Sequence, residues 1–144
     1  MEKEVFITIK GVHTAEGEAD ETEIIIPGTY YFRDGKHFVC YEEANEHTGE
    51  VSKSLLKISP SSVEMIKRGS NATHLVFEKD KKYYTNMKTE IGALSLAMDT
   101  KAVQIQGTQE DRTIEATISY SLEMNEQKVS DCQVKIVVSS DSQL

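Results

Sequence analysis

The sequence predicts an all-β protein, a single closed antiparallel meander barrel of about eight to ten strands, with a β-sandwich as the alternative. Apolar and polar residues alternate over many short segments, which is the period of a strand with one buried face. No segment of ten residues has helical periodicity. Turn signals rich in Gly, Asn and Asp separate the segments at the spacing typical of these folds.

The chain of 144 residues is short enough for one domain. We expect a single barrel domain over residues 1–139 and a polar tail over residues 140–144, with no internal repeat. A hydrophobic content of 38% indicates that each strand has one face in water, which favours antiparallel pairing. A closed barrel is preferred because an open meander would leave two long unpaired edges.

The clearest element is a hairpin over Gly28 to Glu43. Its turn is Asp34-Gly35, a dipeptide that tolerates the positive φ angles of a type I′ turn. This turn predicts cross-strand partners in the order Arg33 with Lys36, Phe32 with His37, Tyr31 with Phe38, Tyr30 with Val39, and Thr29 with Cys40. It places Tyr30, Phe32, Val39 and Tyr41 inward, and Tyr31, Arg33, Phe38 and Cys40 outward.

Before this hairpin, Val5 to Lys10 alternates as a strand that ends at Gly11. The acidic stretch from Val12 to Glu23 has few apolar residues, and its outer part is expected to be a solvated turn or loop. A strand resumes at Ile24, and Pro27-Gly28 is expected to interrupt it with a bend, because proline is confined to edges, ends or bulges of strands.

The middle of the chain contains shorter segments. Turns are expected at residues 45–49, 69–71 and 107–111, and Asp80 to Lys82 is expected to form a charged hairpin tip. In residues 63–68 the alternation is loose, so both faces of that strand are expected to be partly covered. The expected strands cover residues 51–59, 63–68, 73–78, 82–88, 93–99 and 102–106.

The last hairpin has the most regular alternation. Its first strand places Ile114, Ala116, Ile118, Tyr120, Leu122 and Met124 on one face. Asn125 to Gln127 turns the chain into a final strand over residues 128–139. That strand alternates Cys132, Val134, Ile136 and Val138 with polar neighbours.

The chain resembles the YwiB-like family, small bacterial proteins of unknown function described as calycin-type, or lipocalin-like, β-barrels. The resemblance is carried by short strings whose order and spacing match over most of the length: residues 9–11 (IKG), 30–43 (YYFRDGKHFVCYEE), 48–49, 56–59, 68–69, 77–84 and 120–131. It implies a closed barrel in a bacterial cytoplasm. Comparison with lipocalins suggests an interior that holds a small apolar ligand, by analogy of fold.

The charge of the chain argues against two classes of partner. A net charge of −8 disfavours nucleic acid and anionic membranes, which attract proteins with surplus Lys and Arg. Lys79, Lys81 and Lys82 beside Tyr83 and Tyr84 belong to the one basic and aromatic cluster, which is typical of a guarded strand edge. No apolar run is long enough to span a bilayer, and no signal peptide is evident. Two cysteines, taken as reduced thiols, indicate a cytoplasmic protein.

No pattern of residues indicates catalysis, a metal or a cofactor. The four histidines lie in separate segments, and His37 and Cys40 are expected on opposite faces of one strand. The adjacent carboxylates at Glu42-Glu43 and Glu110-Asp111 also point to opposite faces, unlike an acid and base in one cleft. We therefore expect a protein that is not an enzyme.

The functional hypothesis is a barrel whose interior binds a small apolar or amphipathic molecule. The alternative is a protein-interaction scaffold or a dimerising structural barrel without a small ligand, and either a monomer or a homodimer is compatible with the sequence. The inward face of the two clearest hairpins supplies the candidate ligand-binding residues: Tyr30, Phe32, Val39, Tyr41, Ile118, Tyr120 and Leu122.

Overall fold

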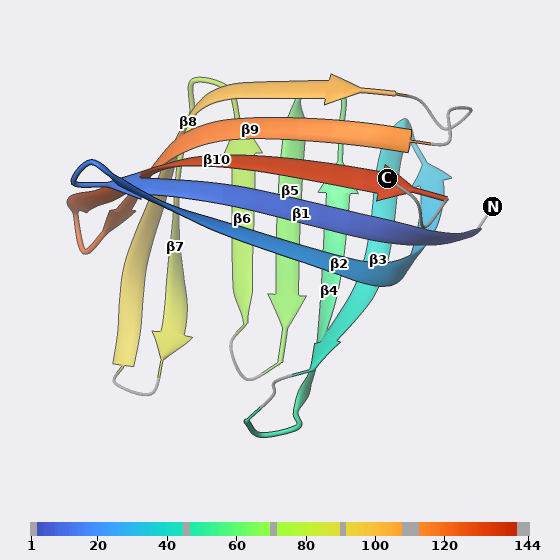
Figure 1. Ribbon diagram of the computed structural model, residues 1–144, viewed down its shortest axis with the longest axis horizontal. Coiled ribbons are helices and arrows are strands. Elements are labelled where there is room, and N and C mark those ends of the chain that lie inside the picture. The colour runs from blue at the N-terminus through green and yellow to red at the C-terminus, as the bar shows by residue number, and fades with distance from the viewer. Residues whose placement is uncertain (1–2, 45–46, 70–71, 90–91, 108–112, 141–144) are drawn as a thin grey trace.

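The computed structural model describes residues 3–44, 47–69, 72–89, 92–107 and 113–140, and every regular element in them is a β-strand. All ten strands belong to one antiparallel sheet that curls into a nearly closed barrel (Figure 1). The strands are β1 (Lys3–Ala15), β2 (Glu18–Arg33), β3 (Lys36–Ala44), β4 (Val51–Ile58), β5 (Ser62–Arg68), β6 (Thr73–Glu78), β7 (Lys82–Thr89), β8 (Gly92–Gln106), β9 (Thr113–Met124) and β10 (Gln127–Ser139). The predicted fold class is confirmed.

The order of strands in the sheet is β6-β5-β4-β3-β2-β1-β10-β9-β8-β7. Consecutive strands pair with each other except β6 and β7, and the first and last strands pair with each other in the middle of the sheet. The two edges of the sheet are therefore β6 and β7. Residues 1–2, and residues 141–144 of the expected polar tail, lie outside the described residues.

The segment predicted as a charged hairpin tip forms a tight turn but not a hairpin. Asp80 has a φ of 63° and the Lys81 N–H donates to the Glu78 carbonyl over 3.1 Å. Within the described strands, β6 and β7 share no ladder of backbone hydrogen bonds. Instead, Asp80 N–H donates to the Thr100 carbonyl at 2.9 Å, and Thr100 N–H donates to the Lys81 carbonyl at 3.0 Å, which ties the turn to β8.

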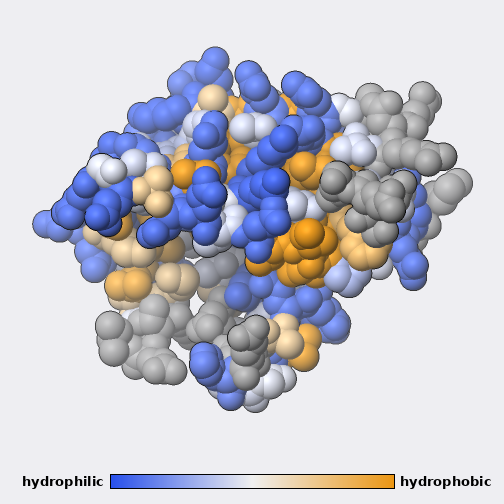
Figure 2. Space-filling view, viewed as in Figure 1, coloured by the Kyte–Doolittle hydropathy of each residue, from blue (hydrophilic) through white to orange (hydrophobic). Residues whose placement is uncertain are grey.

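The inward side chains of the strands form one continuous core. Complete burial of one Val, Leu, Ile, Phe or Met side chain in such a core stabilises the fold by about 1.5–3 kcal/mol. One face of the molecule, seen in Figure 2, is covered mostly by hydrophilic side chains with smaller hydrophobic patches between them, as expected for strands with one wet face. The residues with no exposed surface at all include Val39, Leu56, Ile58, Val63, Ala116, Ile118 and Ile136.

The β2–β3 hairpin has the predicted register. Asp34 and Gly35 both have positive φ angles, 52° and 76°, as a type I′ turn requires. The five predicted cross-strand pairs, from Arg33 with Lys36 to Thr29 with Cys40, are all present. Tyr30, Val39 and Tyr41 are buried and Phe32 packs against the core, so the predicted inward face is confirmed.

The solvated turn predicted for the outer part of residues 12–23 is present at Glu16 and Gly17, and it is shorter than the length of the acidic stretch suggests. On either side of this turn the chain continues β1 and begins β2, and the two strands pair from Lys3 with Tyr30 to Ala15 with Glu18. A turn of two residues suffices because Glu16 and Gly17 both adopt positive φ, 52° and 80°. The acidic side chains are exposed on this extended part of the hairpin, where strand pairing needs no apolar face.

β2 also runs through Pro27 and Gly28, so the expected interruption is absent. Gly28 pairs with Val5 on one side and with Tyr41 on the other, and Pro27 pairs with Phe6. The predicted strands at 93–99 and 102–106 are likewise one strand, β8, with an irregularity in its register between Thr100 and Ala102. A bulge absorbs the extra residue without ending the strand.

The last hairpin agrees with its prediction. Asn125 and Glu126 form its turn with positive φ angles of 49° and 70°, and β9 and β10 alternate as expected. Parts of the turns predicted at 45–49, 69–71 and 107–111 fall on residues 45–46, 70–71 and 108–112, which lie outside the described residues.

Candidate ligand-binding groove

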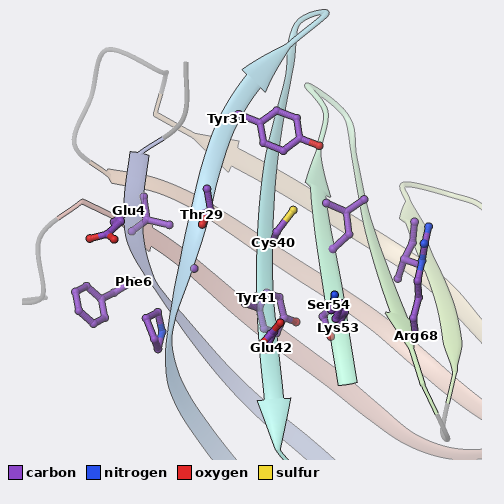
Figure 3. A pocket seen from close by; sticks show the side chains of 15 residues that line it. Glu4, Phe6, Thr29, Tyr31, Cys40, Tyr41, Glu42, Lys53, Ser54 and Arg68 are labelled. Carbon is purple, nitrogen blue, oxygen red and sulfur yellow. The ribbon is translucent and has the colours of Figure 1, made fainter. Parts of the chain in front are cut away.

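A groove with a volume of about 880 Å³ lies on the outer face of the sheet, across β1 to β5 (Figure 3). It is formed where outward side chains of five neighbouring strands meet. The register of the strands arranges these side chains in rows across the sheet, so the groove can be built row by row.

The floor of the groove is one row of small and apolar side chains. Thr29 pairs with Cys40, Cys40 with Leu55, and Leu55 with Ile66, so these four residues cross β2 to β5 side by side. Leu55 and Ile66 are half-buried although they point away from the core, and Cys40 is exposed as a free thiol. An apolar row on the outer face is unusual in a sheet whose other outward positions are mainly polar.

The next row closes one end of the groove with aromatic rings. Tyr31 and Phe38 stack with ring centroids 4.8 Å apart and planes inclined by 5°. The Lys57 ammonium lies 5.8 Å from the centre of the Phe38 ring and 3.5 Å from a Glu64 carboxylate oxygen. These contacts hold the Tyr31 ring at the end of the groove, where Figure 3 shows it above Cys40.

Glu64 on β5 continues the row of Tyr31, Phe38 and Lys57, and its carboxylate contacts His74 on the edge strand β6. His74 Nε2 lies 2.8 Å from Glu64 Oε1, and this hydrogen bond, together with the Lys57 charge, lowers the pKa of the Glu64 carboxyl despite its partial burial. The carboxylate form is therefore the one that the structure stabilises.

The opposite end of the groove carries charged side chains. Glu42 pairs with Lys53, and Lys53 pairs with Arg68, so one carboxylate and two cations form a row across β3, β4 and β5. Figure 3 shows Glu42 and Lys53 together at this end, with Arg68 at one flank and Glu4 and Phe6 of β1 at the other. Neither Lys53 nor Arg68 forms an ion pair with another described residue.

The seven residues predicted from the sequence as a ligand-binding lining lie together in the core. Tyr30, Val39, Tyr41 and Ile118 are buried, and Phe32, Tyr120 and Leu122 are half-buried against them. Their inward orientation is confirmed, whereas their role in binding a ligand stays a prediction. Of the seven, Tyr41 also lines the outer groove.

Protein groups already satisfy the polar atoms of this inner lining. The Tyr30 hydroxyl lies 2.8 Å from His37 Nδ1, and burial raises the pKa of Tyr30 and lowers the pKa of His37. Burial also raises the pKa of Tyr41, with a contribution from the charge of Glu43 and an opposing hydrogen bond with Ser54. His37 is itself buried, and its hydrogen bond to Tyr30 satisfies one of its ring nitrogens.

The sequence pattern did not single out the groove. Tyr31, Phe38 and Cys40 were assigned correctly to the outward face, but nothing indicated that Tyr31 and Cys40 line a groove. The available signal was the loose alternation of residues 63–68, in which Ile66 occupies an outward position. An apolar residue on the outward face of a strand indicates that this face is also partly buried, and Ile66 is partly buried by the neighbouring side chains of the groove.

The described part of the chain contains no group of three or more His, Cys, Asp or Glu side chains that could hold a metal ion, and it contains no helix long and apolar enough to cross a membrane. In the basic cluster, Lys81 pairs with Glu78 at 2.7 Å and Lys82 with Glu123 at 2.8 Å, so these charges are partly neutralised.

Comparisons with known proteins agree with the fold. The DUF1934 family, described as a domain of unknown function, matches residues 7–136. The solved structure of the ywiB protein from Bacillus subtilis is similar, with a TM-score of 0.82 and 19% sequence identity over 98% of this chain and 94% of that one. None of the curated proteins compared with the chain matches it. At this identity the structural likeness shows a shared fold.

Proposed function

The chain belongs to the DUF1934 family, a domain of unknown function, and we propose that it is a non-enzymatic binding protein for a small amphipathic molecule. The ligand lies in the outer groove, with its apolar part on the row of Thr29, Cys40, Leu55 and Ile66. An acidic group of the ligand contacts Lys53 and Arg68. The observation that carries the proposal is an apolar floor on the outer face of the sheet, inside a hollow of about 880 Å³.

The dimensions of the groove fit a small molecule. Binding sites for such ligands have volumes of roughly 300–1,000 Å³ and combine an apolar lining with a few polar groups. Here the apolar lining is central and the charged groups lie at one end, which matches a ligand with one apolar and one polar end. Arg68 can bind a carboxylate through two parallel hydrogen bonds, and Lys53 adds a second positive charge.

A binding role is favoured over catalysis because the reactive groups of the groove lack partners for proton transfer. Cys40 is a free thiol with no described histidine in the groove lining. A nucleophilic cysteine normally needs a base within hydrogen-bonding distance. Two free thiols also support a reducing compartment such as the cytoplasm.

The test measures binding of dodecanoate and of dodecanol, its uncharged analogue, by isothermal titration calorimetry. We expect Leu55→Glu to weaken binding of dodecanoate at least about tenfold, since it places a charge in the apolar floor. Arg68→Ala should weaken dodecanoate about fivefold to tenfold and leave dodecanol unchanged. Ile25→Glu is the matched control, because Ile25 is an exposed isoleucine on β2 outside the groove, with 58% of its surface accessible.

Two results would contradict the groove. The first is an equal affinity for dodecanoate in the wild type and in Leu55→Glu, which would indicate that the ligand binds in the barrel interior and not in the groove. The second is no binding of either probe, together with a native mass spectrum of the freshly purified protein that shows only the mass of the chain itself.

An interaction scaffold is the second candidate, because both edge strands are open. Tyr84 on β7 is 65% exposed and lies on one of these edges. Unpaired strand edges can add a strand from another chain. Light scattering after size-exclusion chromatography distinguishes the two, since pairing at the edges predicts a dimer or larger assembly that Tyr84→Lys converts into a monomer.

A further inference from the structure

A second cluster of reactive side chains lies away from the groove, at the junction of β1, β10 and β9. His13 on β1 pairs with Cys132 on β10, and Cys132 pairs with Tyr120 on β9, so the three side chains follow one row across the sheet. Figure 1 shows these three strands side by side. His13 Nδ1 lies 3.0 Å from Cys132 Sγ, and the Tyr120 hydroxyl forms a hydrogen bond with the same sulfur.

The sulfur of Cys132 is surrounded by groups that exchange or donate protons. Ser130 Oγ lies 3.3 Å from Sγ, in addition to the contacts with His13 and Tyr120. Burial, followed by the influence of Cys132, raises the pKa of Tyr120 well above its usual value, so this hydroxyl keeps its proton and acts as a donor. A thiol has one proton to donate, whereas a sulfur that loses its proton can accept all of these bonds.

The histidine ring lies beside Gly11 and Asp20. A side-chain carbon at Gly11 would lie 3.5 Å from His13 Nε2, an ordinary van der Waals distance, and 3.1 Å from Thr22 Oγ1, which is tighter. Asp20 on β2 is the register partner of His13 on the side away from Cys132. Asp131 and Lys128, neighbours of the cluster in sequence, pair with each other at 3.0 Å.

Access to Cys132 is narrow. Only 4% of Cys132 is exposed, whereas His13 beside it is half-buried and so still reaches solvent. Cys40, by contrast, is exposed. We therefore expect a reagent of the size of two oxygen atoms to reach Cys132 past His13 where a bulky one does not.

We propose that Cys132 and His13 form a peroxide-reactive thiol site, separate from the groove, at which hydrogen peroxide or a small hydroperoxide oxidises Cys132 to a sulfenic acid. His13 takes the thiol proton as the sulfur attacks the nearer peroxide oxygen. A sulfur–oxygen bond forms and the oxygen–oxygen bond breaks. The departing hydroxide takes the proton from His13 and leaves as water. The sulfur loses two electrons and the peroxide gains them.

The test treats the folded full chain with hydrogen peroxide for set times and then unfolds it in denaturant that contains dimedone, which traps sulfenic acids at either cysteine regardless of burial. Cys40→Ser leaves only Cys132, and Cys132→Ser leaves only Cys40. Because the base at His13 assists the attack, we expect Cys132 to form the adduct at least about tenfold faster than Cys40 at pH 7. Ellman's reagent, which is bulky, should give the opposite order.

His13→Gln in the Cys40→Ser background tests the base. We expect the rate at Cys132 to fall at least about tenfold and to rise only toward alkaline pH, as for a simple thiol. Circular dichroism checks the fold, and if this variant is unfolded, Ser130→Ala provides a second variant, with a smaller loss of rate expected. An oxidation rate at Cys132 that does not exceed that at Cys40 would overturn the proposal, and so would an unchanged rate and pH profile in folded His13→Gln.

Discussion

Gly28 lies where the groove and the core share a wall, and replacing it with alanine tests the packing of β1, β2 and β3. An added side-chain carbon would lie 2.8 Å from the Cys40 carbonyl oxygen, 3.1 Å from Ile7 Cδ1 and 3.2 Å from Val39 Cγ1. The side chains of Ile7 and Val39 could rotate or shift, but the carbonyl belongs to the backbone of the paired strand. Accommodating the methyl group therefore requires β2 and β3 to move apart.

The expected cost follows from these contacts. Overpacking of a core by one methylene costs about 1–3 kcal/mol, and contact with backbone places Gly28→Ala at the upper end. Alanine also restricts the unfolded chain, which offsets roughly 0.4–1 kcal/mol. The net loss in the free energy of unfolding is about 2 kcal/mol, equivalent to a decrease in Tm of roughly 4–8 °C for a chain of this length.

Urea unfolding followed by circular dichroism measures this loss. Gly17→Ala is the matched control, because Gly17 has no atom within 4 Å of an added carbon but has a φ of 80°. There, only the left-handed backbone conformation is penalised, by about 1 kcal/mol before any gain from the unfolded chain. If the free energy of unfolding of Gly28→Ala lies within about 0.5 kcal/mol of the wild-type value, β2 and β3 do not approach each other this closely at Gly28.

Two further predictions concern buried polar groups. Burial lowers the pKa of His37, so below about pH 6.5 the unfolded state binds more protons than the folded state, and the free energy of unfolding should decrease as the pH is lowered. Thermal unfolding between pH 5 and 7 should show this dependence, and His37→Gln should make it weaker. An equal dependence on pH in both proteins would contradict the assignment to His37. Thr100 Oγ1 is fully buried and has no hydrogen-bond partner among the described residues. Thr100→Val should therefore leave the free energy of unfolding unchanged or raise it by up to about 1 kcal/mol, whereas Ser130→Ala, which removes a partner of Cys132, should lower it. If Thr100→Val lowers the free energy of unfolding as much as Ser130→Ala does, the Thr100 hydroxyl does have a partner.

The elements predicted correctly from the sequence are hairpins whose turn residues and alternation of apolar and polar residues lie within the hairpin itself. The Asp34-Gly35 turn and the alternation around it determined the register of β2 and β3, and the same holds for the alternation of β9 and β10. The turn within residues 12–23 is only two residues long, a length that the acidic composition of this stretch does not indicate. Glu16-Gly17 is as short a turn as Asp34-Gly35, but without apolar flanks it did not stand out.

Neither candidate site could be predicted from local patterns, because each depends on which strands become neighbours. The His13–Cys132 pair joins residues 119 positions apart and exists only because β1 and β10 pair. The groove needs the registers of β2 through β5 to bring Cys40, Leu55 and Ile66 into one row. Alternation tells which face a side chain occupies, whereas its neighbours on that face follow from strand order and register.

The same reasoning explains why the barrel is nearly but not fully closed. A turn as short as Lys79 to Lys81 would ordinarily begin a hairpin, but its backbone groups bond to Thr100 of β8, which directs β7 along β8 and away from β6. Side chains then span the seam: His74 on β6 contacts the Tyr83 ring of β7 at 5.9 Å, and Phe77 contacts Tyr120 at 4.8 Å. Lys81 and Lys82, paired with Glu78 and Glu123, keep charge beside the two open edges. Charged side chains at strand edges oppose pairing with other chains, so the seam can stay open without a backbone ladder to close it.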